Sequence, residues 1–264
     1  MKVFYHSNCI DGAVSARIVY ETAPLASFHP IQYGDKEAIN IQNENLVFLD
    51  WCPEPDDLVR LCETNKSVVV LDHHKTAIER TKDIKYPNLY GVREVGASGA
   101  LLTWRYYGWE GEVPILVKYA NDHDLWIREL PNVAEIVRGM YLSIEDWDKW
   151  SLYSIKEFEE SGRVLSEFAK QQIDSAIEGM IVKRTAWGIC GIINCPPCWV
   201  SEALNRICLE THVDYAMAYY DFKDQRRYSF RSVGDMDVSE IACAYGGGGH
   251  KNAAGCTGKR PPTL

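Results

Sequence analysis

The sequence lacks any apolar run long enough to cross a membrane or to form the core of a secretory signal peptide. It also lacks low-complexity segments, and no repeat appears at the periods of solenoids or propellers. These absences argue against a membrane protein and against a repeat array. We therefore expect a cytoplasmic globular protein that does not bind membranes.

The chain has no excess of basic residues. It carries 28 Lys and Arg against 37 Asp and Glu, which gives a formal net charge of −9 and a pI of about 5.3. Proteins that bind long duplex DNA usually carry a basic footprint, so such DNA is excluded as the main partner. The acidity does not exclude a nucleotide, because divalent cations bound by clustered Asp residues reverse the local field.

The cysteines do not form a disulfide framework. There are nine of them, an odd number, scattered along the chain, which is typical of a reducing compartment. One pair, Cys195 and Cys198, is separated by two prolines. A zinc site would require a second pair at suitable spacing, and a redox site would require a thioredoxin-like context. Neither accompanies this pair, so we interpret it as a strand-to-helix turn.

The first half of the chain alternates short apolar runs with helical patterns. The runs are nearly continuously apolar, as in parallel strands that are covered on both faces. The expected strands are residues 3–5, 46–49 and 68–71, and the expected helices are residues 12–22, 55–64 and 98–107. This βαβ rhythm predicts an α/β fold whose N-terminal domain is built on a doubly wound, mainly parallel sheet.

The second half predicts a smaller α/β domain. Apolar residues recur at three-to-four-residue spacing from residue 154 to about residue 184, which predicts a connecting helix. Strands are expected over residues 187–194, 215–221 and 227–232, with helices over residues 201–209 and 239–245. We therefore divide the 264 residues into a domain over 1–150, a helical linker over 151–185 and a domain over 186–264.

Polar side chains gather where the predicted strands of the first domain end. In a parallel sheet, ligands bind beyond the carboxyl ends of the strands. The residues concerned are His6, Asp11, Asp50, Asp72, His73, His74, Asp122 and Asp124. A single His or Asp at a strand end is usually a cap or a turn residue. Three consecutive polar residues, Asp72-His73-His74, directly after the four aliphatic residues 68–71 are hard to explain as a cap or a turn.

Carboxylates and imidazoles that converge at one sheet edge favour bound divalent cations, because the carboxylates would otherwise repel one another. Mixed His and Asp ligation suits Mn²⁺ or a similar ion. Two ions that share a bridging carboxylate would activate a water molecule and hold a phosphoryl oxygen. The sequence therefore predicts a two-metal site for phosphoester chemistry.

A second signal lies near the end of the chain, where four glycines precede His250, Lys251 and Asn252. Glycine allows backbone N–H groups to approach an anion closely, so the run favours a phosphate-binding nest over a flexible hinge. Upstream, Arg231 alternates with Ser229 in an extended segment, so the two side chains share a face. An Arg presented in this way is a good bidentate ligand for phosphate.

The sequence resembles the DHH/DHHA1 phosphoesterase superfamily, which includes RecJ-type exonucleases, nanoRNases and the related family II pyrophosphatases. The resemblance depends on Asp72-His73-His74, with Asp50 before it and Asp122 after it, and on Gly247-Gly248-Gly249-His250. These motifs occur in the same order as in that superfamily and cover both halves of the chain.

The resemblance implies a role for each site residue. The implied metal ligands are His6, Asp11, Asp50, His73 and Asp122, with Asp50 bridging two divalent ions, for which Mn²⁺ is expected and Mg²⁺, Co²⁺ or Zn²⁺ are alternatives. Asp72 would orient a histidine, and His74 would face the substrate phosphate. The far end of the substrate would be held by Ser229, Arg231, Gly247, Gly248, Gly249, His250 and Asn252.

One residue departs from the superfamily pattern. Cys9 stands where the first motif usually has a carboxylate ligand. A thiolate is a softer ligand and favours zinc or iron over magnesium. Alternatively, Asn8 or a water molecule completes the site and leaves it weaker.

We interpret the chain as a metal-dependent phosphodiesterase that hydrolyses short oligonucleotides by a metal-activated water, in the manner of a nanoRNase or exonuclease. The small second domain and the absence of a broad basic groove favour short or small substrates. The alternatives are a cyclic mononucleotide or dinucleotide phosphodiesterase, a nucleotide 3′-phosphatase, and a nucleotide-binding sensor with a degenerate metal site. A monomer or a homodimer is expected.

Overall fold

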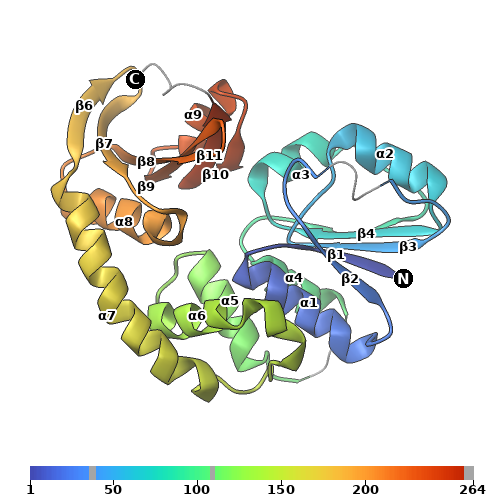
Figure 1. The fold of residues 1–264 in the computed structure, drawn as a ribbon. Helices are drawn as coiled ribbons and strands as arrows, with labels where there is room; N and C mark the ends of the chain where they lie inside the picture. The colour runs from blue at the N-terminus through green and yellow to red at the C-terminus, as the bar shows by residue number, and fades with distance from the viewer. Residues whose placement is uncertain (36–39, 108–110, 259–264) are drawn as a thin grey trace. The chain divides into compact units, whose positions relative to one another are not determined.

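The computed structural model describes residues 1–35, 40–107 and 111–258. The chain divides into two compact units, Met1–Ser166 and Glu167–Leu264. Both units are α/β, which confirms the predicted fold class (Figure 1). Among the helices of the described residues, none has the length and apolar character needed to span a bilayer.

The first unit contains a five-stranded parallel sheet in the order β2-β1-β3-β4-β5. The strands are β1 (Lys2–His6), β2 (Ser27–Ile31), β3 (Asn45–Leu49), β4 (Ser67–Asp72) and β5 (Leu89–Arg93). The three predicted apolar runs form β1, β3 and β4, the inner strands. The edge strands β2 and β5 were not predicted, since their side chains are mostly half-buried or exposed and leave no continuous apolar run.

Alternate residues of the inner strands pack on opposite faces of this sheet. Val3 and Val47 belong to one apolar core, whereas Phe4 and Phe48 belong to another. The first core includes residues of α1 (Ile10–Thr22), α4 (Gly99–Tyr106), α5 (Ile115–Asp124) and α6 (Val133–Leu142). The second includes residues of α2 (Pro55–Thr64) and α3 (Lys75–Thr81). Helices therefore cover both faces, as in a doubly wound fold (Figure 1).

The second unit contains a six-stranded mixed sheet in the order β10-β11-β9-β8-β7-β6. The strands are β6 (Ile181–Thr185), β7 (Gly188–Asn194), β8 (Tyr215–Phe222), β9 (Gln225–Ser232), β10 (Gly248–His250) and β11 (Ala253–Gly258). Two helices, α8 (Pro197–Glu210) and α9 (Val238–Ala244), contribute to separate apolar cores. The predicted strands and helices of this half correspond to β7, β8, β9, α8 and α9.

The predicted connecting helix was too long at its C-terminal end. The helix α7 (Lys156–Glu178) ends just before Gly179, and the chain continues as β6. Glycine is a poor helix former, and the β-branched Ile181 and Val182 favour an extended chain. Apolar spacing alone could not separate these residues from the preceding helical pattern.

Candidate active site

Asp50 lies at the centre of a polar cluster beyond the carboxyl ends of β1, β3 and β4. Its side chain is only 1% exposed. One carboxylate oxygen, Oδ2, lies 3.4 Å from Nδ1 of His6 and 3.2 Å from Sγ of Cys9. The other oxygen, Oδ1, lies 3.2 Å from Nε2 of His73. The two oxygens of one buried carboxylate thus face two different sets of ligand atoms.

An unusual backbone conformation at Asp50 and two glycines allow these segments to lie close together. Asp50 has a φ of 54°, a left-handed conformation that is uncommon outside glycine and is often found at functional sites. A Cβ atom on Gly99 would lie 2.8 Å from Cβ of Asp50 and 3.0 Å from Oδ2 of Asp11. A Cβ atom on Gly12 would lie 2.2 Å from the carbonyl oxygen of His6. Both glycines are needed because the segments approach too closely for any side chain.

Asp11 is fixed by the N-terminus of α4. Its carboxylate accepts hydrogen bonds from the backbone N–H of Gly99 at 2.6 Å and of Ala100 at 2.9 Å. The start of a helix leaves such N–H groups without intrahelical partners, and its dipole favours an anion. Oδ2 of Asp11 also lies 3.6 Å from Nε2 of His73. Asp11 therefore joins the set that faces Oδ1 of Asp50.

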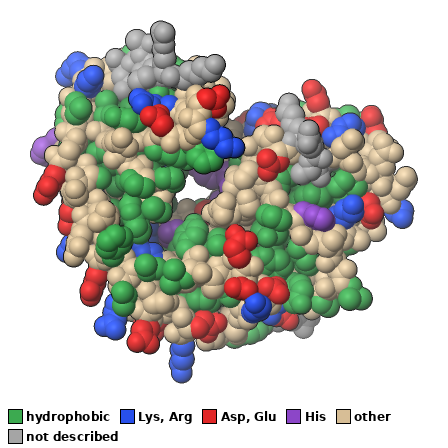
Figure 2. All heavy atoms as spheres, in the orientation of Figure 1, with side chains coloured by type: hydrophobic (Ala, Val, Ile, Leu, Met, Phe, Trp, Pro, Cys, Tyr) green, Lys and Arg blue, Asp and Glu red, His purple; other side chains and the backbone are tan. Residues whose placement is uncertain are grey.

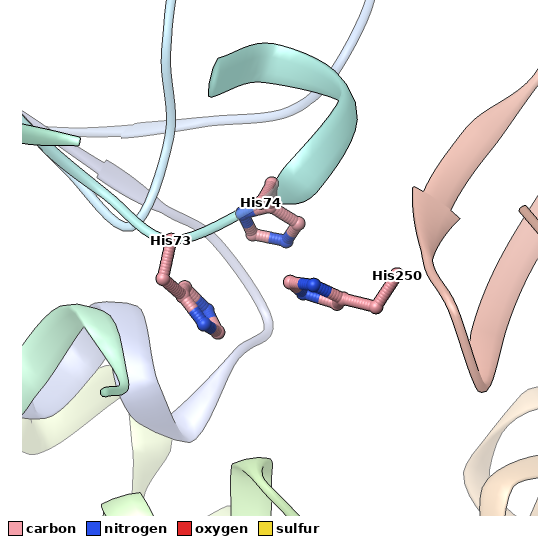
Figure 3. Close-up of side chains that lie close together, drawn as sticks. All are labelled: His73, His74 and His250. Carbon is pink, nitrogen blue, oxygen red and sulfur yellow. The ribbon is translucent and has the colours of Figure 1, made fainter. Parts of the chain in front are cut away.

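Asp72 holds the following histidines in place. Its Oδ1 accepts hydrogen bonds from the backbone N–H groups of His73 at 2.9 Å and His74 at 3.3 Å, and it lies 2.7 Å from Nδ1 of His74. Figure 3 shows His73 and His74 where the chain leaves β4, just before α3. The contact between Nδ1 of His74 and Asp72 fixes the orientation of the imidazole ring.

The structure places Asp124, rather than Asp122, in the cluster. Oδ2 of Asp124 lies 3.4 Å from Nε2 of His73. The carboxylate of Asp122 instead accepts backbone N–H groups of the loop that follows α5, from Arg128 at 2.6 Å, Glu129 at 3.0 Å and Leu130 at 2.7 Å. This corrects the expected position of Asp122, whose carboxylate closes a turn.

Burial and like charges shape the protonation of the cluster. Burial, together with the charges of Asp50 and Asp124, raises the pKa of Asp11 well above its usual value. Burial would also raise the pKa of Asp50, but the nearby imidazoles of His6 and His73 outweigh it and lower that pKa. Burial alone would lower the pKa of His73, yet the surrounding carboxylates raise it to about 10. The cluster thus has an excess of buried negative charge, which a cation would neutralise.

The donor atoms fit divalent metal ions. Asp50 is common to three groups whose ligand atoms lie within 4.8 Å of one another. These groups are Asp11 with Asp50 and His73, His6 with Cys9 and Asp50, and Asp50 with Asp72 and His74. Carboxylate and imidazole ligands suit Mn²⁺ and related ions, and a shared carboxylate is what a two-metal site requires.

Two tyrosines that no sequence motif indicated border the cluster. Tyr33 is 44% exposed, and its ring centroid lies 5.5 Å from that of His6 and 5.9 Å from that of His74. Tyr141 is 45% exposed, and partial burial together with the neighbouring Cys9 and Asp124 raises its pKa. Isolated tyrosines in a loop and in α6 carry no motif, so the sequence offered no signal for them.

The predicted substrate residues of the second unit lie on β9, on β10 and the residue before it, and in the turn before β11. Arg231 pairs with Ala253, and Ser229 with Gly255, so that small residues lie opposite both. Nη2 of Arg231 donates to Oγ of Ser201 in α8 at 2.8 Å. Asn252 donates from Nδ2 to Oγ of Ser232 at 3.0 Å, which braces this turn.

The glycine run is not the open nest that the sequence suggested. Gly248 and Gly249 belong with His250 to the short strand β10, which pairs with β11. A Cβ atom on Gly247 would lie 2.0 Å from the carbonyl oxygen of Gly255, and Gly249 has a φ of 141°. The glycines therefore allow the two backbones to lie close together, with β10 at the edge of the sheet.

Comparison with known proteins identifies one matching domain family and a viral relative. Residues 194–264 match the DHHA1 domain family. Protein R106 of Acanthamoeba polyphaga mimivirus is 29% identical over 287 residues, which cover 96% of this chain. The chain spans 66% of that relative's length.

Two solved structures share the fold at 14% sequence identity. One is a pGpG-specific phosphodiesterase, PggH, from Vibrio cholerae, with a TM-score of 0.53, covering 97% of this chain and 92% of that one. The other is an exopolyphosphatase-related protein from Bacteroides fragilis, with a TM-score of 0.59, covering 99% and 87%. The DHHA1 match in the second half of the chain and the shared fold agree with the resemblance to the DHH/DHHA1 superfamily that the Asp72-His73-His74 motif carries.

Proposed function

We propose that this protein is a cytoplasmic, metal-dependent phosphodiesterase that hydrolyses short oligonucleotides or small nucleotides. The observation that carries the proposal is the position of Asp50. Each of its carboxylate oxygens faces a separate set of ligand atoms, as a carboxylate that bridges two divalent ions must. The nine free cysteines suit a reducing compartment.

Five residues would hold the metal ions in this proposal. They are His6, Asp11, Asp50, His73 and Asp124, and the last of these takes the place first given to Asp122. Bound divalent ions would supply charge neutralisation, polarise a phosphoryl oxygen and lower the pKa of a water molecule. The N-terminus of α4 holds Asp11 in position, and the left-handed backbone at Asp50 aims its carboxylate into the cluster.

His74 is the residue we assign to the substrate phosphate. Asp72 lies 2.7 Å from Nδ1 of His74 and outweighs the effect of burial, so the pKa of His74 is raised. A protonated His74 would direct Nε2–H toward a phosphoryl oxygen and stabilise the charge that develops during hydrolysis. Asp72 would act only through His74, by fixing the direction of the ring.

The second unit would bind the part of the substrate away from the scissile bond, through Arg231, Ser229 and His250. Nη1 of Arg231 donates to the carbonyl oxygen of Phe230 at 3.1 Å and Nη2 donates to Oγ of Ser201 at 2.8 Å, which orients the guanidinium, and an arginine can bind a phosphate through two parallel N–H groups. On the face seen in Figure 2, Lys and Arg side chains are scattered among Asp and Glu and form no continuous basic stripe. This supports a short substrate over a long nucleic acid strand.

The proposal is tested with a substrate panel on purified protein loaded with Mn²⁺, Mg²⁺, Co²⁺ or Zn²⁺ in turn. The panel contains dinucleotides to pentanucleotides of RNA and DNA, linear and cyclic dinucleotides, cyclic mononucleotides, a nucleotide 3′-phosphate, polyphosphate and long single strands. We expect metal-dependent turnover of the two-to-five-nucleotide oligomers and none of long strands. The variant Asp50→Asn should lose nearly all turnover, and Asp57→Asn, a surface change on α2, should retain it.

Other outcomes separate the alternatives. Preference for cyclic substrates or for the 3′-phosphate would replace the oligonucleotide assignment with those activities, and preference for polyphosphate would remove nucleotides from the proposal. Tight binding of a dinucleotide without turnover in any metal would indicate a sensor instead of an enzyme.

A further inference from the structure

The two oxygens of Asp50 face chemically different partners. Around Oδ2 lie the thiol of Cys9 at 3.2 Å and the imidazole of His6 at 3.4 Å. Around Oδ1 lies the imidazole of His73 at 3.2 Å, itself in contact with the carboxylates of Asp11 and Asp124. One position offers sulfur, nitrogen and oxygen, whereas the other offers only nitrogen and oxygen. Two ions that share Asp50 would therefore meet different ligands.

The spacing around Oδ2 fits direct coordination. Zinc binds cysteine sulfur at about 2.3 Å and histidine nitrogen or carboxylate oxygen at about 2.0–2.2 Å, in tetrahedral geometry. Two ligand atoms on a tetrahedron of those dimensions lie about 3.3–3.7 Å apart. The separations of Cys9 and His6 from Oδ2 of Asp50 are 3.2 and 3.4 Å. Little movement of the side chains would be needed.

We propose that Cys9 is a metal ligand and that the position formed by His6, Cys9 and Asp50 selects a thiophilic divalent ion such as Zn²⁺, Co²⁺ or Fe²⁺. The position around Oδ1, made of carboxylates and imidazole, keeps a preference for Mn²⁺ or Mg²⁺. On binding, the Cys9 thiol loses its proton to solvent as the metal–sulfur bond forms, and no electron is transferred. The inference rests on the proposed metal site and adds to it a difference between its two positions.

A purely structural role for Cys9 makes a different prediction. Cys9 is the residue that precedes α1, and its thiol donates a hydrogen bond to Asp50. If that hydrogen bond were its only task, Cys9→Ser would preserve it, because a hydroxyl is a good donor. Serine would, however, be a poor ligand for a thiophilic ion. The variant Cys9→Ser therefore separates the two roles.

The experiment is a titration of the apoprotein with Co²⁺, followed by absorption spectroscopy. Thiolate-bound Co²⁺ gives a sulfur-to-metal charge-transfer band in the near ultraviolet, and all bound Co²⁺ gives weaker ligand-field bands. We expect the charge-transfer band to saturate at a single equivalent and to vanish in Cys9→Ser while ligand-field bands remain. Zn²⁺ should abolish the band stoichiometrically, Mn²⁺ should not, and Cys9→Ser should bind Zn²⁺ at least about tenfold more weakly.

The matched control is Cys198→Ser, which removes an exposed thiol of the second unit. This variant should keep the charge-transfer band. A band that persists in Cys9→Ser, or ligand-field bands without any charge-transfer band in the wild type, would overturn the assignment of Cys9 and leave the metal site intact. No cobalt binding at all would overturn the proposed function as well.

A second measurement does not depend on the folding of a Cys9 variant. X-ray absorption at the zinc edge of Cys198→Ser protein, loaded with a single equivalent of Zn²⁺, should show a sulfur neighbour at about 2.3 Å. A first shell of nitrogen and oxygen only would refute the proposal. Replacement of Cys9 by a carboxylate, Cys9→Asp, should then reverse the preference, so that Mn²⁺ competes with Zn²⁺ more successfully than in the wild type.

Discussion

The backbone N–H of Gly99 donates a hydrogen bond to Oδ2 of Asp11 at 2.6 Å. The contact joins two residues that are 88 positions apart in the sequence and brings the first turn of α1 against the start of α4. It explains how a fully buried carboxylate is kept in place beside two others: the helix N-terminus supplies partial positive charge where the proposed metal ligands converge. The glycine is as much a part of the site as the carboxylate.

We predict that Gly99→Ala will damage both stability and metal binding. The added methyl group would lie 2.8 Å from Cβ of Asp50 and 3.0 Å from Oδ2 of Asp11, so one or both must move. Overpacking of this kind costs about 1–3 kcal/mol. Urea unfolding and metal titration measure the two effects. The control is Gly179→Ala, where the nearest atom is 3.6 Å from the added carbon, and wild-type metal affinity in Gly99→Ala would contradict the prediction.

Replacement of Asp122 and of Asp124 by alanine should have opposite effects: the first should lower stability, and the second should lower metal content and turnover. Asp122→Ala removes the acceptor of three backbone N–H groups and should lower the free energy of unfolding by about 1–3 kcal/mol. Asp124→Ala removes a carboxylate that raises the pKa of Asp11 and is itself repelled by Asp50, so stability in chelator should be unchanged or higher, while metal content and turnover fall. Unfolding curves with and without chelator, together with metal analysis, distinguish the two. The reverse pattern would restore the ligand assignment to Asp122.

This pair shows what the sequence could and could not predict. The motif and the strand ends predicted that His6, Asp50, His73 and His74 would converge, and the structure brings them together. The choice between Asp122 and Asp124 depends on how the end of α5 is oriented. Two positions along a helix point about 200° apart, and nothing in the local sequence says which carboxylate faces the sheet. The loop after α5 determines which carboxylate faces the sheet, because its backbone N–H groups bind Asp122.

The glycine run near the end of the chain shows a second limit. Consecutive glycines indicate that backbone must approach something closely, and the sequence alone favoured an anion as that partner. In the structure the partner is the neighbouring strand β11, against which Gly247 and Gly249 pack without room for a side chain. The pattern correctly predicted close approach, but strand pairing over such a short segment depends on tertiary contacts. The short strand β10 could not be predicted from three residues.

We predict that Asp72 and His74 act as one unit. Asp72→Asn should lower kcat/KM about 10- to 100-fold, the usual loss when the partner of a functional histidine is removed. His74→Gln should cause a similar or larger loss. Because Asp72 acts through the ring of His74, the double variant should be no worse than His74→Gln alone.

The rate and the metal content of all three proteins are measured on one dinucleotide. Losses that multiply in the double variant would show that Asp72 has a separate task. Loss of metal in Asp72→Asn would place that task in the metal site, where Asp50, Asp72 and His74 have ligand atoms close together.

Replacement of Arg231 should distinguish a role in substrate binding from a role in the chemical step. Arg231 lies in the second unit, where Ser201 holds its guanidinium, and the proposal gives it the distal phosphate of the substrate. Loss of a charge-assisted contact of this kind costs about 1.5–3 kcal/mol, or roughly 10- to 100-fold in kcat/KM. Since the contact would also position the scissile bond, part of the loss should appear in kcat. The measurement compares Arg231→Ala with the wild type on a dinucleotide and on an aryl phosphodiester that has no second nucleotide.

The loss should be large on the dinucleotide and nearly absent on the aryl ester, with bound metal at the wild-type level. Arg226→Ala is the matched control, because Arg226 lies on the same strand and is paired with Asp221 at the surface through contacts of 2.6 and 2.9 Å. It should change both activities less than about twofold, as surface substitutions usually do. Equal losses on the two substrates in Arg231→Ala would mean that this arginine supports the reaction or the fold itself. Equal losses from Arg226→Ala and Arg231→Ala on the dinucleotide would instead mean that the general charge of the unit attracts the substrate, because a specific grip requires the two arginines to differ.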